Sequence, residues 1–373
     1  MKNFFRISLL AIIFLGSYGI YIIIKRPTSL YPFPYILKNT SYDDLERAEG
    51  ADILIVGDRM AGGLDNFKSS LLKGLSKEFS TDLIIYNWAE ENEGLHRTLD
   101  KLSSLKKYPG IIIYQGASRE FYEEKFGLKG AQEFANNLEK FKDPKTISLI
   151  MAYPLFSKFI YSYKNIIKLG PKSQIFQGER VSQEMQKLFE IGYQVFDLEM
   201  DKLVEMAGEK NFSLFLLTSP INLKIPPKEI CSNSTSPSLE NELSEISNLL
   251  KEGKSKESFE RISILGNSIQ GNAKIYYLLG MSLEGIGRFE DAALALNQGS
   301  AFDCYPWRSN IVFNNIIRSQ SGKKNIFMVD FDRIVNQNFG IRNLFMDEIF
   351  PKIEFYDLLG AEMAPMIGTI FKR

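Results

Sequence analysis

The sequence is poor in histidine and cysteine, and these shortages exclude several kinds of chemistry. Among 373 residues there is one histidine, His96, and there are two cysteines, Cys231 and Cys304. A metal site made of several histidines is therefore excluded, and any mechanism that needs an imidazole base has to use His96. Two cysteines are too few for a disulfide scaffold. One bridge between them and two unpaired thiols remain open alternatives.

The chain also lacks net charge. It carries 45 Lys and Arg residues against 45 Asp and Glu residues, so no overall field draws it to nucleic acid. Its apolar content of 45% supports a sizeable core. The length fits one large domain with an insert, or two domains. No Walker-type or dinucleotide-binding glycine loop occurs in the sequence, and we expect no cofactor.

Charged side chains are absent from the apolar run Ile7–Ile24. About 20 such residues cross a bilayer as a helix. A cleaved signal peptide ending at Gly16-Ser17 is the alternative. Because the run continues to Ile24, we favour an uncleaved transmembrane anchor at residues 1–26. A proline-containing linker at 27–44 then leads to a body outside the cytoplasm.

Apolar runs in the body alternate with helical patterns, which predicts an α/β fold with a parallel sheet. The expected strands are Ile53–Val56, Leu83–Tyr86, Gly110–Tyr114, Leu214–Thr218 and Ile326–Asp330; the expected helices include Leu64–Phe79, Leu95–Lys106 and Ser182–Gly208. The apolar stretch Ile147–Leu169 is interpreted as a core helix or lid, with membrane contact as the alternative. Sites in open sheets lie beyond the carboxyl ends of the strands.

A repeat interrupts this alternation. The motif that begins at Gly253 recurs at Gly287, an offset of 34 residues (253 to 287) that matches tetratricopeptide repeats. We predict a helical insert at residues 231–304, with units at Leu239–Asn272 and Ala273–Tyr305. An ordinary pair of helical hairpins is the alternative. Because about three units are needed to cover a core, two units must pack on the body or on a partner.

The end of the first strand resembles a known enzyme family. The turn Gly57-Asp58-Arg59 resembles the first block of the SGNH (GDSL-type) hydrolases, where the third residue is the nucleophilic serine. The resemblance covers residues 45–230 and 305–370 and implies a flavodoxin-like parallel sheet. The α/β domain is thus expected in two parts, 45–230 and 305–373. In this chain Arg59 replaces the serine.

The middle blocks of the family are partly retained. The second block keeps Gly94, and His96 follows two residues later, where the family does not place its base. We expect His96 at the surface or at the start of a helix. The third block, Gly116–Tyr122, resembles the Gly-His-Asn-Glu-Phe-Tyr block of tetratricopeptide-linked relatives, but its oxyanion asparagine is replaced by Ser118 or Arg119.

The last block keeps Asp347 and replaces the catalytic histidine with Phe350. Arginine cannot attack a carbonyl and phenylalanine cannot accept a proton. The resemblance therefore implies a pseudo-hydrolase with no intact catalytic residue. The vestigial positions are Arg59, Gly94, Ser118, Arg119, Asp347 and Phe350.

The charge of Arg59 requires a partner. We expect Arg59 to point toward Asp347 or Glu120. The alternative is that Arg59 and Arg119 bind a carboxylate or phosphate.

The sequence thus predicts a membrane-anchored scaffold that binds protein partners of an envelope complex through the concave groove of its repeats. We place it in the bacterial inner membrane, with one span and a periplasmic body, and expect no contact with nucleic acid. The alternative is an acyl-ester hydrolase or O-acyltransferase partner that uses Ser118 or His96. Ligand sensing in the vestigial pocket is a third hypothesis.

Overall fold

The computed structural model describes residues 12–18, 41–65, 68–69, 72, 83–121, 182–228, 236–268, 271–303 and 307–371. The chain divides into two compact units, and of the first unit only the short helix at 12–18 is described. Among the described residues, no helix has the length and apolar character needed to cross a membrane. Apart from that short helix, the predicted anchor lies outside the described residues, as do the linker up to residue 40 and the stretch Ile147–Leu169.

The second unit, Lys38–Glu123 with Pro171–Arg373, is built on a five-stranded parallel sheet. Its strands, in the order β2-β1-β3-β4-β5, are β1 (Ile53–Gly57), β2 (Ile85–Asn87), β3 (Ile111–Gln115), β4 (Ser213–Leu217) and β5 (Ile326–Val329). All five predicted strands are confirmed, with their ends shifted by one or two residues. Every residue of β1 and β3 is buried, as apolar strands covered on both faces require. The α/β fold is therefore confirmed.

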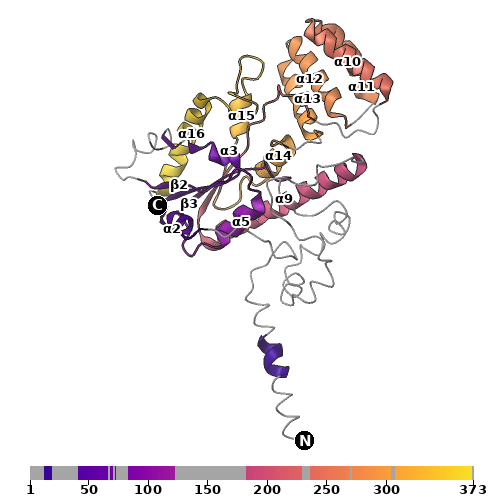
Figure 1. Ribbon diagram of the computed structural model, residues 1–373. Helices are drawn as coiled ribbons and strands as arrows, with labels where there is room; N and C mark the ends of the chain where they lie inside the picture. Colours follow the sequence, from indigo (N-terminus) through magenta and orange to yellow (C-terminus); the bar gives the residue numbers. More distant parts are fainter. Residues whose placement is uncertain are drawn as a thin grey trace, which may run out of the picture. The chain divides into compact units, whose positions relative to one another are not determined.

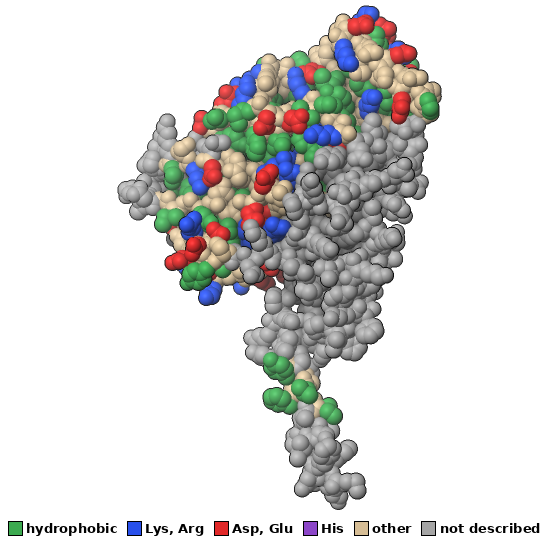
Figure 2. All heavy atoms as spheres, in the orientation of Figure 1, with side chains coloured by type: hydrophobic (Ala, Val, Ile, Leu, Met, Phe, Trp, Pro, Cys, Tyr) green, Lys and Arg blue, Asp and Glu red, His purple; other side chains and the backbone are tan. Residues whose placement is uncertain are grey.

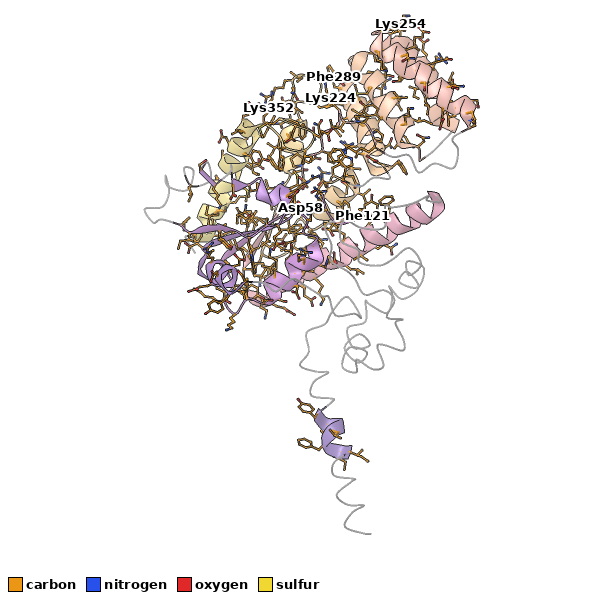
Figure 3. All side chains as sticks on the ribbon, viewed as in Figure 1. Asp58, Phe121, Lys224, Lys254, Phe289 and Lys352 are labelled. Carbon is orange, nitrogen blue, oxygen red and sulfur yellow. The ribbon has the colours of Figure 1, made fainter. Side chains whose placement is uncertain are left out.

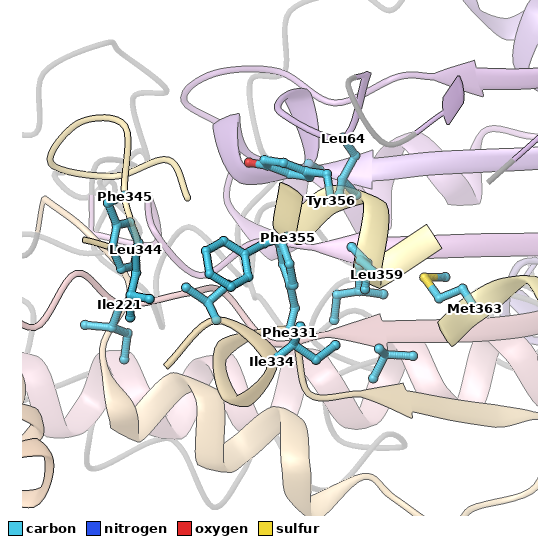
Figure 4. Close-up of a cluster of buried hydrophobic side chains, with 14 of the residues drawn as sticks. Leu64, Ile221, Phe331, Ile334, Leu344, Phe345, Phe355, Tyr356, Leu359 and Met363 are labelled. Carbon is cyan, nitrogen blue, oxygen red and sulfur yellow. The ribbon is translucent and has the colours of Figure 1, made fainter. Parts of the chain in front are cut away.

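Helices cover both faces of the sheet. One core includes side chains of α15 (Phe331–Asn336) and α16 (Ile353–Phe371), and Figure 4 shows Phe331, Phe355 and Leu359 within it. The other core lies beneath α2 (Tyr42–Gly50), α5 (Leu95–Ser103), α9 (Ser182–Lys210) and α14 (Ile311–Ser319). The long helix that the sequence predicted from Ser182 is confirmed. The helix predicted at Leu64–Phe79 lies mostly outside the described residues, after the short helix α3 (Arg59–Gly62).

Four consecutive helices form the insert, which lies between β4 and α14 in the described chain. They are α10 (Pro237–Lys251), α11 (Ser255–Ser268), α12 (Ala273–Gly285) and α13 (Phe289–Ala301). Gly253 and Gly287 turn the chain within each helix pair, with φ of 76° and 82°, which glycine adopts without strain. β5 pairs with β4, so the sheet continues after these helices. Cys231 and Cys304 lie outside the described residues.

The helical insert packs on the α/β body. Leu283 of α12 and Leu296 of α13 belong to the same core as the strands. A Cβ atom on Gly280 would come within 2.4 Å of Leu296 Cγ, so α12 and α13 approach closely. The body also covers α12 through the loop after β4, where the Tyr277 hydroxyl donates to the Lys224 carbonyl at 3.1 Å. No residue of α12 before Gly285 is more than partly exposed.

Candidate functional site

The order of the strands singles out one place at the carboxyl edge of the sheet. The chain proceeds outward in opposite directions from β1 and β3, which are neighbours, so the loops that follow them diverge. Open α/β sheets bind their ligands at such a point. The residues there are Asp58 and Arg59 after β1, and Gly116 to Ser118 after β3; Figure 3 labels Asp58. The topology thus brings the first and third sequence blocks together, as predicted.

Gly57 shapes the turn after β1. Its φ is +130°, and a Cβ atom there would lie 1.9 Å from the Gln115 carbonyl oxygen. Only glycine fits such an approach between neighbouring strands. The next residue, Asp58, accepts from the Met60 amide at 2.8 Å and from the Ser118 amide at 2.7 Å. Burial raises the pKa of Asp58 to about 6, against the effect of these hydrogen bonds. Asp58 therefore joins the two turns.

The guanidinium of Arg59 lies where the loops after β1 and β3 diverge. Its Nε donates to Ser118 Oγ at 3.3 Å, and its Nη2 donates to the backbone carbonyl of Trp307. The predicted pairing with Asp347 is wrong. The Asp347 carboxylate instead accepts from the amides of Ile349 and Phe350, at 2.7 and 2.6 Å. Asp347 is used to close its own turn.

Each residue of the segment Ser118–Glu120 lies near a polar or charged group. Ser118 is buried, and its amide and side chain contact Asp58 and Arg59. Arg119 Nη2 lies 3.8 Å from Glu91 Oε1. Glu120, the other expected partner of Arg59, accepts from the Leu95 amide at 2.9 Å. The anion site between the two arginines stays a prediction.

Gly94 is the N-cap of α5, and a buried lysine holds the loop that precedes it. Lys101 Nζ donates to the Trp88 carbonyl at 2.6 Å and to Glu93 Oε2 at 2.7 Å. The Thr98 hydroxyl donates to the other oxygen of Glu93 at 2.5 Å. Burial raises the pKa of Glu93 to about 7, although Lys101 opposes the shift.

Sequence reasoning missed the Glu93–Lys101 pair. Leu95, Thr98 and Leu102 share one helix face, and Lys101 lies at its edge, three residues after Thr98. A lysine at such an edge normally reaches solvent, so the periodicity by itself did not predict a buried cation.

His96 starts helix α5, as expected, but it is buried rather than on the surface. Its Nδ1 lies 4.0 Å from Glu199 Oε1, and both side chains are almost fully inaccessible. The cause is α9, which covers α5 and carries Glu199. Burial raises the pKa of Glu199 well above its usual range. The imidazole thus faces α9, whereas the Ser118 hydroxyl faces Arg59.

The last sequence block lies close to the first in the folded chain. A Cβ atom on Gly63 would lie 3.0 Å from the Phe350 ring, so this ring packs against the residue that follows α3. Phe350 therefore lies close to the turn of Arg59. In the part of the chain that the structure describes, no cluster of three His, Cys, Asp or Glu residues could hold a metal ion.

Comparison with models of known families, with curated proteins and with solved structures finds no match to this chain.

Proposed function

We propose that this protein is a catalytically inactive, SGNH-like scaffold that is anchored in a bacterial inner membrane. The observation that carries the proposal is the position of Arg59. Its guanidinium occupies the turn from which a nucleophile would attack, and it is joined to Ser118 and Trp307. A protonated guanidinium has no lone pair for attack on a carbonyl, and the phenyl ring of Phe350 has no basic atom.

The arrangement of the blocks supports the SGNH-like assignment. The strand order is that of flavodoxin-like sheets. Ser118 lies beside Arg59, and Phe350 packs on Gly63 at the end of α3. Segments far apart in the sequence thus meet where the family assembles its active site. The side chains that would react there have been replaced.

An ester hydrolysis assay tests the loss of catalysis. The full chain, purified in detergent, is offered short-chain aryl esters. We expect turnover at the rate of the uncatalysed reaction, in wild type and in Ser118→Ala alike. Turnover above background that Ser118→Ala or His96→Ala abolishes would overturn the proposal in favour of an acyl-ester hydrolase or O-acyltransferase partner.

The helical insert supplies the scaffold's partner-binding surface in this proposal. The recurrence of Gly253 at Gly287 and the close approach of α12 and α13 support a pair of tetratricopeptide-like units. In this proposal the partner binds the outer face of α10, where Asn241 and Asn248 are exposed. Figure 2 shows charges of both signs mixed over the insert, which suits a protein partner better than nucleic acid.

Partner binding is tested with the full chain in its native membrane by chemical cross-linking. The variant Asn241→Arg/Asn248→Arg places two bulky cations on the outer face of α10. The matched control, Ala361→Arg, adds a cation on the exposed face of α16. We expect the first variant, but not the control, to lose cross-linked envelope proteins. Loss in neither variant removes α10 from the proposal.

Membrane attachment in this proposal comes from residues 1–26. Fractionation of cells that express the full chain should recover it with the inner membrane, and added protease should reach the body only after the outer membrane is opened. Recovery of a shortened, soluble form would instead support a cleaved signal peptide.

A further inference from the structure

Two connecting segments join the helical insert to the α/β body, and they lie against each other. The entry segment, Asn222–Lys228, follows β4; the exit segment, of which the structure describes Asp303 and residues 307–310, follows α13. Residues 307–310 of the exit segment are all buried, although they belong to no helix or strand. A buried irregular segment has to find partners for its polar groups.

Arg308 connects the exit segment to the entry segment. Its Nη1 donates to the Asn222 carbonyl at 2.6 Å and its Nη2 to the Ile225 carbonyl at 3.0 Å. Burial lowers the pKa of Arg308 to about 10, so the side chain stays charged at neutral pH. Both acceptors belong to the main chain. The contact therefore depends on the path of the backbone and not on the side chains at positions 222 and 225.

A second pair of contacts connects the same segments. The Lys228 amide donates to both carboxylate oxygens of Asp303, at 3.2 and 3.1 Å. The ammonium group of Lys228 lies 3.8 Å from the centre of the Trp307 ring, within the range of a cation–π interaction. The entry and exit segments thus form one unit at the base of the insert.

Arg59 connects this unit to the sheet. Its Nη2 donates to the Trp307 carbonyl, again a main-chain acceptor, while its Nε donates to Ser118 Oγ. The link joins residues 248 positions apart in the sequence. From Arg59 the contacts continue through Asp58 to the turn after β3.

We infer that Arg59 and Arg308 form an arginine clasp that seats the helical insert on the sheet and couples its position to the turns of Asp58 and Ser118. Displacing the insert withdraws the Trp307 carbonyl from Arg59 and thereby loosens both turns. A partner that pulls on the insert would in this way alter the turns of Asp58 and Ser118. The inference rests on these contacts alone and does not require the SGNH resemblance.

Hydrogen exchange measured by mass spectrometry on the full chain tests the clasp. In Arg59→Ser and in Arg308→Lys we expect amide exchange in 303–310 and 222–228 to rise at least tenfold, with β3 and β4 unchanged. The matched control is Arg288→Ser, which removes an exposed arginine of the insert that is paired with Asp291. A change in Arg59→Ser that stays within residues 57–63 would overturn the inference.

Tryptophan fluorescence provides an independent measurement. The chain has two tryptophans, so Trp88→Phe leaves Trp307 as the single fluorophore. In that background we expect Arg59→Ser to shift the emission to longer wavelength and to increase quenching by acrylamide. If Arg59→Ser does not fold, Arg59→Lys decides, because it keeps the charge but loses the fork that reaches two acceptors. Unchanged emission in the folded variant would contradict the clasp.

Discussion

Two loops at the edge of the sheet are each held by a buried cation, but the cations are stabilised differently. In the lysine turn, Trp88–Leu95, the charge of Lys101 faces the buried carboxylate of Glu93 at 2.7 Å. In the arginine clasp, Arg308 donates to two neutral carbonyls. Removing Lys101 would leave the buried carboxyl group of Glu93 without its direct partner, whereas removing Arg308 would leave two main-chain carbonyls unpaired near the carboxylate of Asp303. The lysine turn should therefore be the more sensitive region.

The largest effect is expected from Lys101→Met. Loss of this cation leaves Glu93 without its partner, and we expect the free energy of unfolding to fall by about 3–5 kcal/mol. The matched change Arg308→Met should cost about 1–3 kcal/mol, the typical cost of leaving buried acceptors unpaired. Urea denaturation of the full chain measures both. Equal losses in the two variants would remove the distinction between the regions.

A double variant sharpens this comparison. If the cost of Lys101→Met comes from the charge of Glu93, Lys101→Met/Glu93→Gln should be more stable than Lys101→Met alone. A further loss in the double variant would mean that Glu93 stabilises the turn through contacts other than its pairing with Lys101, such as the hydrogen bond that it accepts from Thr98.

The two regions should also differ in their dependence on pH. Folding raises the pKa of Glu93 from 4.5 to about 7, so the folded protein retains a proton that the unfolded chain has already released in this interval. The contribution of Glu93 to the free energy of unfolding is fully present below about pH 4.5. It is lost as the pH rises through about 7. The free energy of unfolding falls by roughly 3 kcal/mol across this pH interval. Glu93→Gln should remove this part of the slope.

Arg308→Gln provides the control for that slope. An arginine stays protonated across the whole interval, so this variant should keep the wild-type dependence between pH 4.5 and 7. The measurement is urea denaturation at several pH values. A slope that Arg308→Gln flattens as much as Glu93→Gln would place the titrating group elsewhere.

Local sequence patterns predicted the sheet, but they did not predict the partners of Lys101, Arg59 and Arg308. Runs such as Ile53–Val56 give strands wherever they pair, and all five predicted strands are in the sheet. The observed strand ends differ from the predicted ones because each strand extends only as far as its neighbours provide hydrogen bonds. The two glycines of the 34-residue recurrence, Gly253 and Gly287, both lie in turns between helices.

The environment of the candidate site was less predictable, because long-range packing determines it. Opposite charge suggested Asp347 or Glu120 as the partner of Arg59, yet one acceptor of its guanidinium is the main-chain carbonyl of Trp307, which no side-chain pattern encodes. His96 was expected at the surface or at the start of a helix; it lies in the first turn of α5, but its burial by α9, which begins far along the chain, was not predicted. The identities of Arg59 and Phe350 were visible in the sequence, whereas their contacts were not.

The smallest expected difference compares one hydroxyl in each region. Thr98 donates to the buried carboxylate of Glu93, and Tyr277 donates to the Lys224 carbonyl at a more exposed place. Hydrogen bonds to charged groups contribute about 1.5–3 kcal/mol, and neutral ones about 0.5–1.5 kcal/mol. Thr98→Val should therefore destabilise the protein more than Tyr277→Phe does in thermal and urea denaturation. The reverse order would show that solvent reaches Glu93. The lysine turn would then not be better shielded from water than the arginine clasp.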